Sequence, residues 1–353
     1  MKDKCIILTG GGTAGHVTLN INLEDELFKH FEKIVYIGSH NGIEKELIKK
    51  NTNYNYQEID SCKLARKKFL QNLKIPFTLS RAIKQAKQII KTENPSIIFS
   101  KGGYVGLPVV IAGKKLGIPV ICHESDISMG LANKIAKRYA TKICTNFKLT
   151  TDQNGPKCEH TGMPLKLSTL TKNQAKTKLK ISTDKPVLLI TGGSLGAKTL
   201  NDFVFQNLDA LTKEYFILHL VGKNNFNKKA KCKDYLQLEF SNDMWTIFKA
   251  TDYAISRAGA NTIVELLSNQ IPTIFVPLPK SVSRGDQVDN AKFLESIGVS
   301  KTILQEELNL EKTQNLLNFM KNNADFIKNN INNANFKDGT QNIINIILQQ
   351  KNT

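Results

Sequence analysis

The feature that most limits the possible folds of this chain is a repeated plan: an apolar strand, a glycine turn and a helix. The first copy is CIILT at 5–9 followed by GGGTAGHV, and the second is PVLLITGGSLGAKTLN at 186–201. Strands that are apolar along their whole length are typical of parallel sheets covered by helices on both faces. The repeat therefore predicts an α/β fold of two Rossmann-like, doubly wound halves that face each other across a cleft.

The length of the chain also favours two domains. Its 353 residues exceed what a single hydrophobic core usually serves. Between residues 148 and 183 the sequence becomes polar and loses its strong periodicity. We place the boundary in this stretch, with an N-terminal domain over 1–163 and a C-terminal domain over 164–339.

The charge of the chain favours an anionic partner. Its 49 Lys and Arg residues outnumber its 31 Asp and Glu residues, which gives a net charge of +18. Nucleic acid, anionic lipid and anionic substrates all fit such a charge. No aromatic platform and no recognised nucleic-acid-binding module accompanies it, so a basic nucleic-acid-binding protein is the weaker alternative.

The cysteine pattern and the hydropathy of the chain indicate in which cellular compartment the protein is expected. The six cysteines form no C-x-x-C pair and no metal-ligand spacing with the six histidines, so we expect reduced core thiols in a cytosolic protein and no metal site. No apolar run approaches the ~20 residues of a membrane span. A strand follows MKDK without a signal peptide, so we expect a protein that is soluble or at most peripheral.

A candidate anion site lies in the stretch from 254 to 277, which again runs through a strand, a glycine turn and a helix. After Gly259, the unpaired N–H groups of the first helical turn can hold a phosphate. Glu265, one turn into the helix, can only accept hydrogen bonds and suits a pair of sugar or ribose hydroxyls. Together they predict a phosphorylated sugar or nucleotide. The alternative is that Gly259 only shapes the loop and Glu265 only complements the helix dipole.

The first glycine run matches the dinucleotide fingerprint G-x-G-x-x-G through Gly10, Gly12 and Gly15. Binding of NAD also requires an acidic residue at the end of the second strand, to hold the ribose. That strand ends in Gly38, Ser39 and His40 instead. NAD is therefore not expected.

Candidate catalytic groups follow the strands of the first half. His16 lies at a helix start, where the helix dipole disfavours the imidazolium, so a neutral ring could accept a proton. The alternative is a histidine that only hydrogen-bonds the loop. The segment HESD ends another strand, where Glu124 or Asp126 could hold substrate hydroxyls or assist as a base. A buried structural carboxylate is the alternative for Glu124.

A basic and apolar loop precedes a helix in the first half. Between 61 and 92 the chain has nine basic residues and no Asp or Glu. Exposed Phe and Leu beside clustered Lys fit the surface of an anionic bilayer, and a solvated basic face is the alternative. The residues expected to contact a membrane are Lys63, Arg66, Lys67, Lys68, Phe69 and Leu70.

Six segments in this order resemble the MurG family of UDP-N-acetylglucosamine:N-acetylmuramyl-(pentapeptide)-pyrophosphoryl-undecaprenol N-acetylglucosamine transferases. They are GGGTAGHV, SKGGYVGLPVV, HESDISMGLANK, TGGSLGAKTLN, SRAGANTIVELL and SRGDQVDNA. The resemblance implies a GT-B fold, with the acceptor on the N-terminal domain and UDP-GlcNAc mainly on the C-terminal domain. It also implies that the final helix, about 340–353, packs back on the first domain.

The activity that this resemblance implies is an inverting transfer of GlcNAc from UDP-GlcNAc to the C4 hydroxyl of MurNAc in lipid I. The product would be lipid II, for peptidoglycan synthesis in the bacterial cell wall. The enzyme would work without a cofactor at the cytoplasmic face of the cell membrane, as a peripheral protein. No Asp-x-Asp occurs in the chain, so a metal-chelating donor site is not indicated.

The resemblance also implies roles for single residues. Thr13, Ala14 and Gly15 would lie at the donor sugar and diphosphate, with His16 as the candidate base. Ser194 would bind the diphosphate. Ala260 and Asn261 would meet the uracil or diphosphate, Glu265 the ribose and Gln287 the GlcNAc hydroxyls. Further substrate-binding positions are Asp126, Asn133, Lys166 and Arg257.

Two segments depart from the family pattern. Where many relatives have N-P-x-R, this chain has MPLK, so Lys166 would contact the nucleotide without the bidentate fork of an arginine. Where others have HEQN, Asp126 replaces the Asn, which changes or removes a contact made by an amide.

A UDP-GlcNAc 2-epimerase-like isomerase is the main alternative, since it shares the fold and the nucleotide. Release of UDP coupled to a lipid-linked disaccharide separates the two activities.

Overall fold

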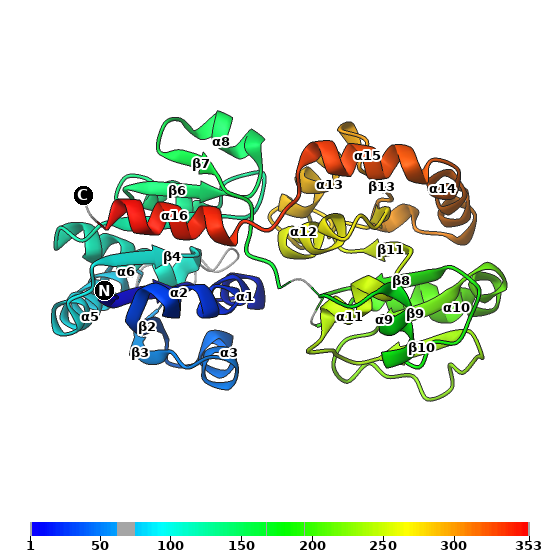
Figure 1. Ribbon diagram of the computed structural model, residues 1–353, viewed down its shortest axis with the longest axis horizontal. Helices are drawn as coiled ribbons and strands as arrows, with labels where there is room; N and C mark the ends of the chain where they lie inside the picture. Colours follow the sequence, from blue (N-terminus) through cyan, green and yellow to red (C-terminus); the bar gives the residue numbers. More distant parts are fainter. Residues whose placement is uncertain (1, 62–74, 167, 194, 352–353) are drawn as a thin grey trace. The chain divides into compact units, whose positions relative to one another are not determined.

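The computed structural model describes residues 2–61, 75–166, 168–193 and 195–351. The chain forms two compact units (Figure 1). The first consists of Met1–Leu165 together with Asp338–Thr353, and the second of Lys166–Lys337. The predicted membrane contacts Lys63, Arg66, Lys67, Lys68, Phe69 and Leu70, and also Ser194, lie outside the described residues.

The first unit is a seven-stranded sheet in the order β3-β2-β1-β4-β5-β6-β7, in which every strand pair is parallel. Its strands are β1 (Asp3–Thr9), β2 (Phe31–Ser39), β3 (Asn55–Ile59), β4 (Ile97–Ser100), β5 (Val120–Glu124), β6 (Lys142–Thr145) and β7 (Cys158–His160). Its helices are α1 (Ala14–Asn22), α2 (Glu24–His30), α3 (Ile43–Asn51), α5 (Ile75–Glu93), α6 (Gly103–Lys115), α7 (Leu131–Ala136), α8 (Lys148–Asn154) and α16 (Thr340–Gln350).

The second unit is a six-stranded parallel sheet in the order β10-β9-β8-β11-β12-β13. Its strands are β8 (Val187–Thr191), β9 (Phe216–Leu220), β10 (Tyr235–Leu238), β11 (Tyr253–Ser256), β12 (Thr273–Phe275) and β13 (Ser300–Thr302). Its helices are α9 (Lys172–Lys178), α10 (Lys198–Glu214), α11 (Met244–Ala250), α12 (Ala260–Ser268), α13 (Asp286–Ser296), the 3-10 turn η1 (Gln305–Glu307), α14 (Leu310–Asn322) and α15 (Ala324–Ala334).

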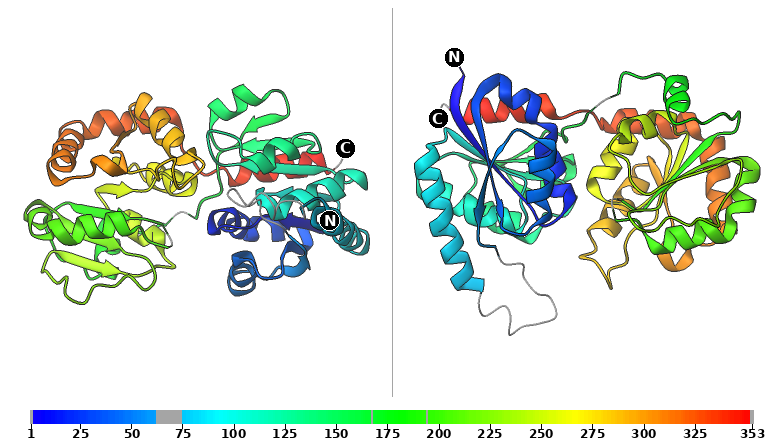
Figure 2. Two further views of the ribbon diagram at one scale, coloured as in Figure 1. Left: turned by 180° about the vertical axis from the view of Figure 1, so that it is seen from behind. Right: turned by 90° about the horizontal axis from the view of Figure 1, so that it is seen from below.

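Helices cover both faces of the first sheet, with α5 and α6 on one face and α2 and α16 on the other (Figure 2). This explains the uniformly apolar strands, because each side chain of β1 from Ile6 to Leu8 meets a helix and is fully buried. The predicted α/β class with doubly wound sheets is confirmed. Cys5, Cys122, Cys144 and Cys158 are buried, but Cys232 is exposed because it lies in a lysine-rich loop between β9 and β10.

The final helix belongs to the first unit, although 172 residues of the second unit separate it in sequence from β7 and its following turn. The backbone N–H of Gly339 donates to the carbonyl of Met163 at 3.0 Å. Asn342 Nδ2 donates to the carbonyl of Thr161 at 3.1 Å. Lys351, in turn, forms an ion pair with Asp3 of β1. The last turn of α16 is therefore fixed to the beginning of the first strand.

Both sheets reverse their strand order at the same place. In the first unit the order reverses between β1 and β4, and in the second between β8 and β11. Ligands of open α/β sheets bind outside the carboxyl ends of the strands at such a switch point. The glycine turns singled out in the sequence follow these central strands, so each unit carries its candidate site there.

Candidate active site

The turn after β1 in the first unit is packed tightly against the turn after β4. Gly12 has φ +88°, and a Cβ there would lie 2.5 Å from the ring of Tyr104. Gly103 has φ +79°, and its Cβ would lie 2.5 Å from the carbonyl oxygen of Gly11 and 3.1 Å from Nδ1 of His16. Only glycine fits both positions, because the left-handed backbone and the contact each exclude a side chain. The two turns therefore hold each other in place at the switch point.

Glu44 of α3 fixes the first glycine turn, a role that the sequence did not reveal. Its carboxylate is fully buried and accepts the N–H of Gly12 at 3.2 Å. It also accepts the N–H of Ser39 at 3.2 Å and the Ser39 hydroxyl. An acid in the first turn of a helix is common near the dipole, so nothing in the sequence distinguished this one from a surface residue.

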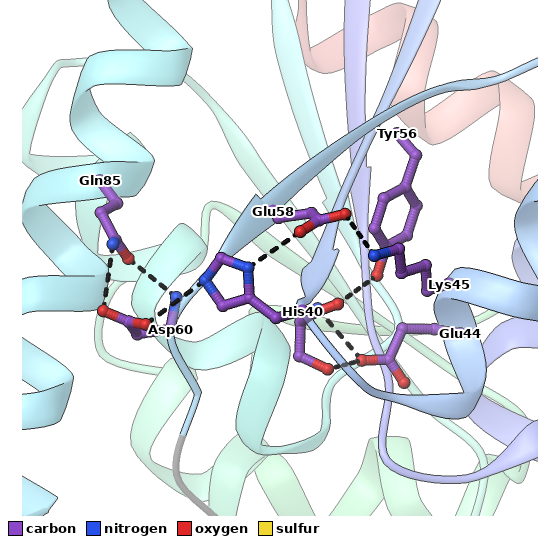
Figure 3. Close-up of polar contacts among 8 residues, drawn as sticks. His40, Glu44, Lys45, Tyr56, Glu58, Asp60 and Gln85 are labelled. Carbon is purple, nitrogen blue, oxygen red and sulfur yellow. Dashed lines mark hydrogen bonds and ion pairs between the residues drawn. The ribbon is translucent and has the colours of Figure 1, made fainter.

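The polar tip of β2 is occupied by contacts within the first unit (Figure 3). His40 lies between two carboxylates, with Nδ1 2.9 Å from Glu58 and Nε2 3.4 Å from Asp60. Gln85 of α5 accepts the N–H of Asp60 at 2.8 Å and donates to its carboxylate at 3.0 Å. This network joins β2, the loop after β3 and α5, so these side chains serve the scaffold.

His16 lies in the first turn of α1, half-buried, with Nδ1 2.8 Å from the carbonyl oxygen of Gly11. A carbonyl only accepts, so Nδ1 carries the proton, and the lone pair of the neutral ring is on Nε2. The two interpretations of His16 are therefore compatible, because the hydrogen bond to the loop also sets the tautomer that a base needs. Thr13 is exposed, and Ala14 and Gly15 are partly exposed, on the same turn.

Glu124 uses both carboxylate oxygens within the first unit. One accepts the N–H groups of Ser125 and Asp126 at 2.9 and 3.1 Å. The other accepts the N–H of Gly130 and Nδ2 of Asn133, both at 2.9 Å. A carboxylate has about four acceptor positions, and the described residues fill them. This geometry favours the structural interpretation of Glu124 over a catalytic one.

Asn133 presents an unpaired acceptor beside the same loop. Its Nδ2 donates to Glu124 and to the carbonyl of His123 at 3.0 Å, which fixes the orientation of the amide. Its Oδ1 is buried without a hydrogen-bond partner among the described residues, 2.8 Å from where a Cβ on Gly102 would lie. Buried polar atoms are usually paired, so this oxygen is suited to a ligand donor.

Gly259, which precedes α12 in the second unit, has empty space on its Cβ side among the described atoms. Gly259 has an ordinary φ of −73°, and a Cβ there would have nothing within 4 Å among the described atoms. Neither backbone conformation nor packing requires glycine at this position. A glycine can also serve close approach of a ligand to the backbone, and this turn precedes the N–H groups of Ala260 and Asn261 in the helix start. The space beside Gly259 is compatible with the anion site predicted from the sequence, which stays a prediction.

Glu265 lies on α12, partly buried, in the turn after the helix start. Burial raises the pKa of its carboxyl group to about 7. Removal from water disfavours the charged form, and no cation of the described residues offsets that cost. The group therefore titrates near neutral pH in the ligand-free protein, which is unusual for a carboxylate and common at functional sites.

Three other residues of the second unit were predicted to bind the substrate, and they differ in how many of their polar groups already have partners within the described protein. Arg257 is buried and donates through its two terminal nitrogens to the carbonyls of Val276 and Pro277 and to Gln305, whereas its Nε has no partner among the described residues. Gln287 accepts the N–H of Leu278 at 3.0 Å through Oε1. Lys166 is exposed at the start of the unit. The described residues contain no group of three or more His, Cys, Asp and Glu side chains arranged to hold a metal ion.

Both halves of the chain match known glycosyltransferase families and their members. The Glycosyltransferase family 28 N-terminal domain matches residues 6–145, and the Glycosyltransferase family 28 C-terminal domain matches residues 187–344. Relatives named UDP-N-acetylglucosamine--N-acetylmuramyl-(pentapeptide) pyrophosphoryl-undecaprenol N-acetylglucosamine transferase from Clostridium tetani and Clostridium botulinum are each 44% identical. The alignments cover 98% of this chain and 98% of each relative.

Solved structures agree with these matches. The crystal structure of MurG from Acinetobacter baumannii has a TM-score of 0.74 at 26% identity, covering 98% of this chain and 99% of that one. A calicheamicin glycosyltransferase has a TM-score of 0.69 at 10% identity, covering 95% and 94%, and shares the fold alone. The prediction of a glycosyltransferase with the GT-B fold is confirmed. The chain belongs to glycosyltransferase family 28 and, within it, to the MurG enzymes.

Proposed function

We propose that this protein transfers GlcNAc from UDP-GlcNAc to the C4 hydroxyl of MurNAc in lipid I, with inversion at the anomeric carbon, to give lipid II. The names of the 44%-identical relatives support the reaction. The observation that carries it in the structure is the space beside Gly259 that the described atoms leave empty at the start of α12, followed one turn later by the carboxyl group of Glu265. That pairing suits a diphosphate joined to a ribose.

The second unit would hold the donor. The first-turn N–H groups of α12 would bind the diphosphate, with Ser194 beside it, and would stabilise the negative charge that grows on UDP as the glycosidic bond breaks. Glu265 would accept from the ribose hydroxyls. Since Oε1 of Gln287 already accepts from Leu278, the Gln287 amide would serve the GlcNAc hydroxyls mainly as a donor. Lys166 would contact the nucleotide as a single point charge.

The first unit would supply the base and the acceptor site. Nε2 of His16 would take the proton of the C4 hydroxyl while the C4 oxygen bonds to the anomeric carbon and the diphosphate oxygen leaves with the bonding electrons. The hydrogen bond from Nδ1 to the Gly11 carbonyl would stabilise the imidazolium that forms. Asp126 and Asn133 would hold acceptor hydroxyls at the neighbouring edge of the sheet.

A substitution of Gly259, the residue that precedes α12, directly tests where the donor binds. Since the described structure has room for a methyl group there, Gly259→Ala is expected to leave the free energy of unfolding unchanged or raise it by less than about 1 kcal/mol. The same methyl would crowd the diphosphate, so the Kd for UDP-GlcNAc, measured by calorimetry, is expected to rise at least about tenfold, a loss of about 1.4 kcal/mol.

A glycine that the fold does require serves as the control. Gly196 has φ +75°, and its Cβ would lie 2.0 Å from the carbonyl oxygen of Val221, so Gly196→Ala is expected to lower stability. Normal donor affinity in a well-folded Gly259→Ala variant would contradict the placement of the diphosphate at α12.

Membrane contact by the first unit is part of the proposal. No helix in the described part of the chain is long and apolar enough to cross a bilayer. Phe77, in the first turn of α5, is 80% exposed, and Arg81 and Lys84 follow on the same helix. An exposed aromatic ring beside basic residues fits an anionic leaflet. It directly follows the predicted loop, so we propose peripheral binding at the cytoplasmic face of the cell membrane.

Charge reversal in that loop tests the membrane proposal. A variant in which Glu replaces four basic residues together, Lys63, Arg66, Lys67 and Lys68, is expected to bind phosphatidylglycerol vesicles about 10³-fold more weakly. The reason is that each basic residue near such a surface contributes about 1 kcal/mol to binding. The measurement is vesicle co-sedimentation. The matched control reverses four exposed lysines of the second unit, Lys228, Lys229, Lys231 and Lys233. Equal losses in both variants would show that only the total charge matters.

A turnover assay with UDP-GlcNAc and a lipid I analogue tests the reaction itself. The expected result is release of UDP in step with a lipid-linked disaccharide, and much slower release with lipid-free MurNAc. Conversion of UDP-GlcNAc to its 2-epimer in the absence of an acceptor would instead identify the isomerase.

A further inference from the structure

Arg257 and Gln305 join the ends of three neighbouring strands in the second unit. Arg257 follows β11 and is only 7% exposed. Its Nη1 donates to the carbonyls of Val276 at 2.9 Å and Pro277 at 3.3 Å, directly after β12. Its Nη2 donates to Oε1 of Gln305 at 2.6 Å, at the start of η1 after β13. One buried guanidinium therefore connects the carboxyl ends of β11, β12 and β13, which are neighbours in the sheet.

The peptide unit between Pro277 and Leu278 carries this connection on to Gln287. Its carbonyl oxygen accepts from Nη1 of Arg257, and its N–H donates to Oε1 of Gln287 at 3.0 Å. The unit is planar and trans, so its C=O and N–H point in opposite directions. Because Arg257 fixes the carbonyl on one side, it also fixes the direction of the N–H on the other.

These contacts determine how the two glutamine amides are oriented. An arginine side chain and a backbone N–H can only donate, so an amide oxygen must face each of them. The oxygen of Gln305 therefore faces Arg257, and the oxygen of Gln287 faces Leu278. The NH2 group of Gln287 is left as the end of that amide that can meet a ligand. Hydrogen bonds connected in this way also polarise one another.

We propose that Gln305 is a positioning residue for the sugar of the donor. It holds the Arg257 guanidinium against the Pro277 carbonyl and so orients the Gln287 amide toward the hydroxyls of GlcNAc. The inference rests on the proposed function, in which Gln287 meets these hydroxyls. Its consequence is selective, because the connected hydrogen bonds end at the sugar, whereas the uridine diphosphate would be held at α12. Loss of the Gln305 amide should weaken binding of UDP-GlcNAc and leave binding of UDP almost unchanged.

Gln305→Met tests this selectivity, because methionine has a similar length but offers Arg257 no strong acceptor. The Kd for UDP-GlcNAc, measured by calorimetry, is expected to rise about fivefold, as for the loss of one neutral hydrogen bond. The Kd for UDP is expected to stay within about twofold of the wild-type value. Gln305→Glu keeps an acceptor of the same shape for Arg257, so it is expected to retain both affinities.

A double-mutant cycle tests whether the two amides act through one another. In a Gln287→Ala background, Gln305→Met is expected to change the Kd for UDP-GlcNAc by less than about twofold, because the group that it positions is gone. Gln314 of α14 is also partly exposed and supplies the matched control. Gln314→Met is expected to leave the affinities for UDP and UDP-GlcNAc unchanged.

Equal losses of affinity for UDP and UDP-GlcNAc in Gln305→Met would overturn the proposal, because Gln305 would then support the whole unit. Unchanged affinity for UDP-GlcNAc, the same loss in the Gln287→Ala background, or an equal loss in Gln305→Glu would also overturn it. A wild-type protein that binds UDP-GlcNAc but transfers no GlcNAc to a lipid I analogue would refute the proposed function instead. The binding cycle would still decide the role of Gln305.

Discussion

His16→Ala is expected to lower kcat for GlcNAc transfer about 10²- to 10⁴-fold, the range that a positioned general base contributes. The Nδ1 hydrogen bond to Gly11 fixes the ring so that Nε2 is the proton-accepting atom. Alanine removes that acceptor and leaves the glycine turn, which Glu44 holds independently through the Gly12 N–H. The loss is therefore expected in the chemical step, measured by single-turnover kinetics at saturating substrate.

Donor binding separates this loss from a damaged fold. The Kd of the His16→Ala variant for UDP-GlcNAc is expected to stay within about threefold of the wild-type value. His30→Ala, at the end of α2, is the control for loss of a histidine elsewhere in the first unit and should retain turnover. Near-full turnover in His16→Ala with intact donor binding would show that another group takes the proton.

Glu265→Gln is expected to change stability and donor binding in opposite directions. The pKa of Glu265 is raised from 4.5 to about 7 in the folded protein. A raised pKa means that the folded state binds the proton more tightly than the unfolded state, so this contribution to stability is complete below pH 4.5 and is lost as the pH rises through 7. Glutamine never ionises. At pH 8 the variant is therefore expected to exceed the wild type by about 3 kcal/mol in free energy of unfolding, with almost no difference at pH 4.5.

Donor binding requires the ionised form of Glu265, whereas stability favours the protonated form. A carboxylate that accepts from two ribose hydroxyls must be ionised, and each charged hydrogen bond contributes about 1.5–3 kcal/mol. The Kd of Glu265→Gln for UDP-GlcNAc is therefore expected to rise at least about 10²-fold. The wild-type affinity is expected to increase about tenfold from pH 6 to pH 8 as the carboxyl group ionises, and the variant should show no such rise.

Denaturant unfolding at pH 4.5 and pH 8, with calorimetric titration of UDP-GlcNAc at pH 6 and pH 8, tests both effects. Asp202→Asn supplies a control carboxylate on an exposed part of α10 and should change neither stability nor donor affinity with pH in this way. A Glu265→Gln variant that is less stable than the wild type at pH 8 would mean that the carboxylate is paired in the folded state.

Local sequence patterns were enough to predict the helices and strands and their order along the chain. Apolar strands such as CIILT and PVLLIT, each ending in a glycine turn and a helix, specify parallel sheets, because only a sheet covered on both faces buries such strands completely. The same patterns located Gly259 and His16 at helix starts on the carboxyl edges of the sheets, and Glu265 one turn into its helix. These inferences succeed because strand, turn and helix signals are local in the chain.

The partners of each polar group, in contrast, could be identified only in the folded protein. Glu44 reaches Gly12 from 32 residues away in sequence, and Glu124 fills its acceptor positions with N–H groups of its own loop and of Asn133 in α7. The openness beside Gly259 is likewise visible only once its surroundings are folded. The physical reason is that hydrogen bonds and burial depend on atoms that the fold brings together, and residue type alone does not say which partners will arrive.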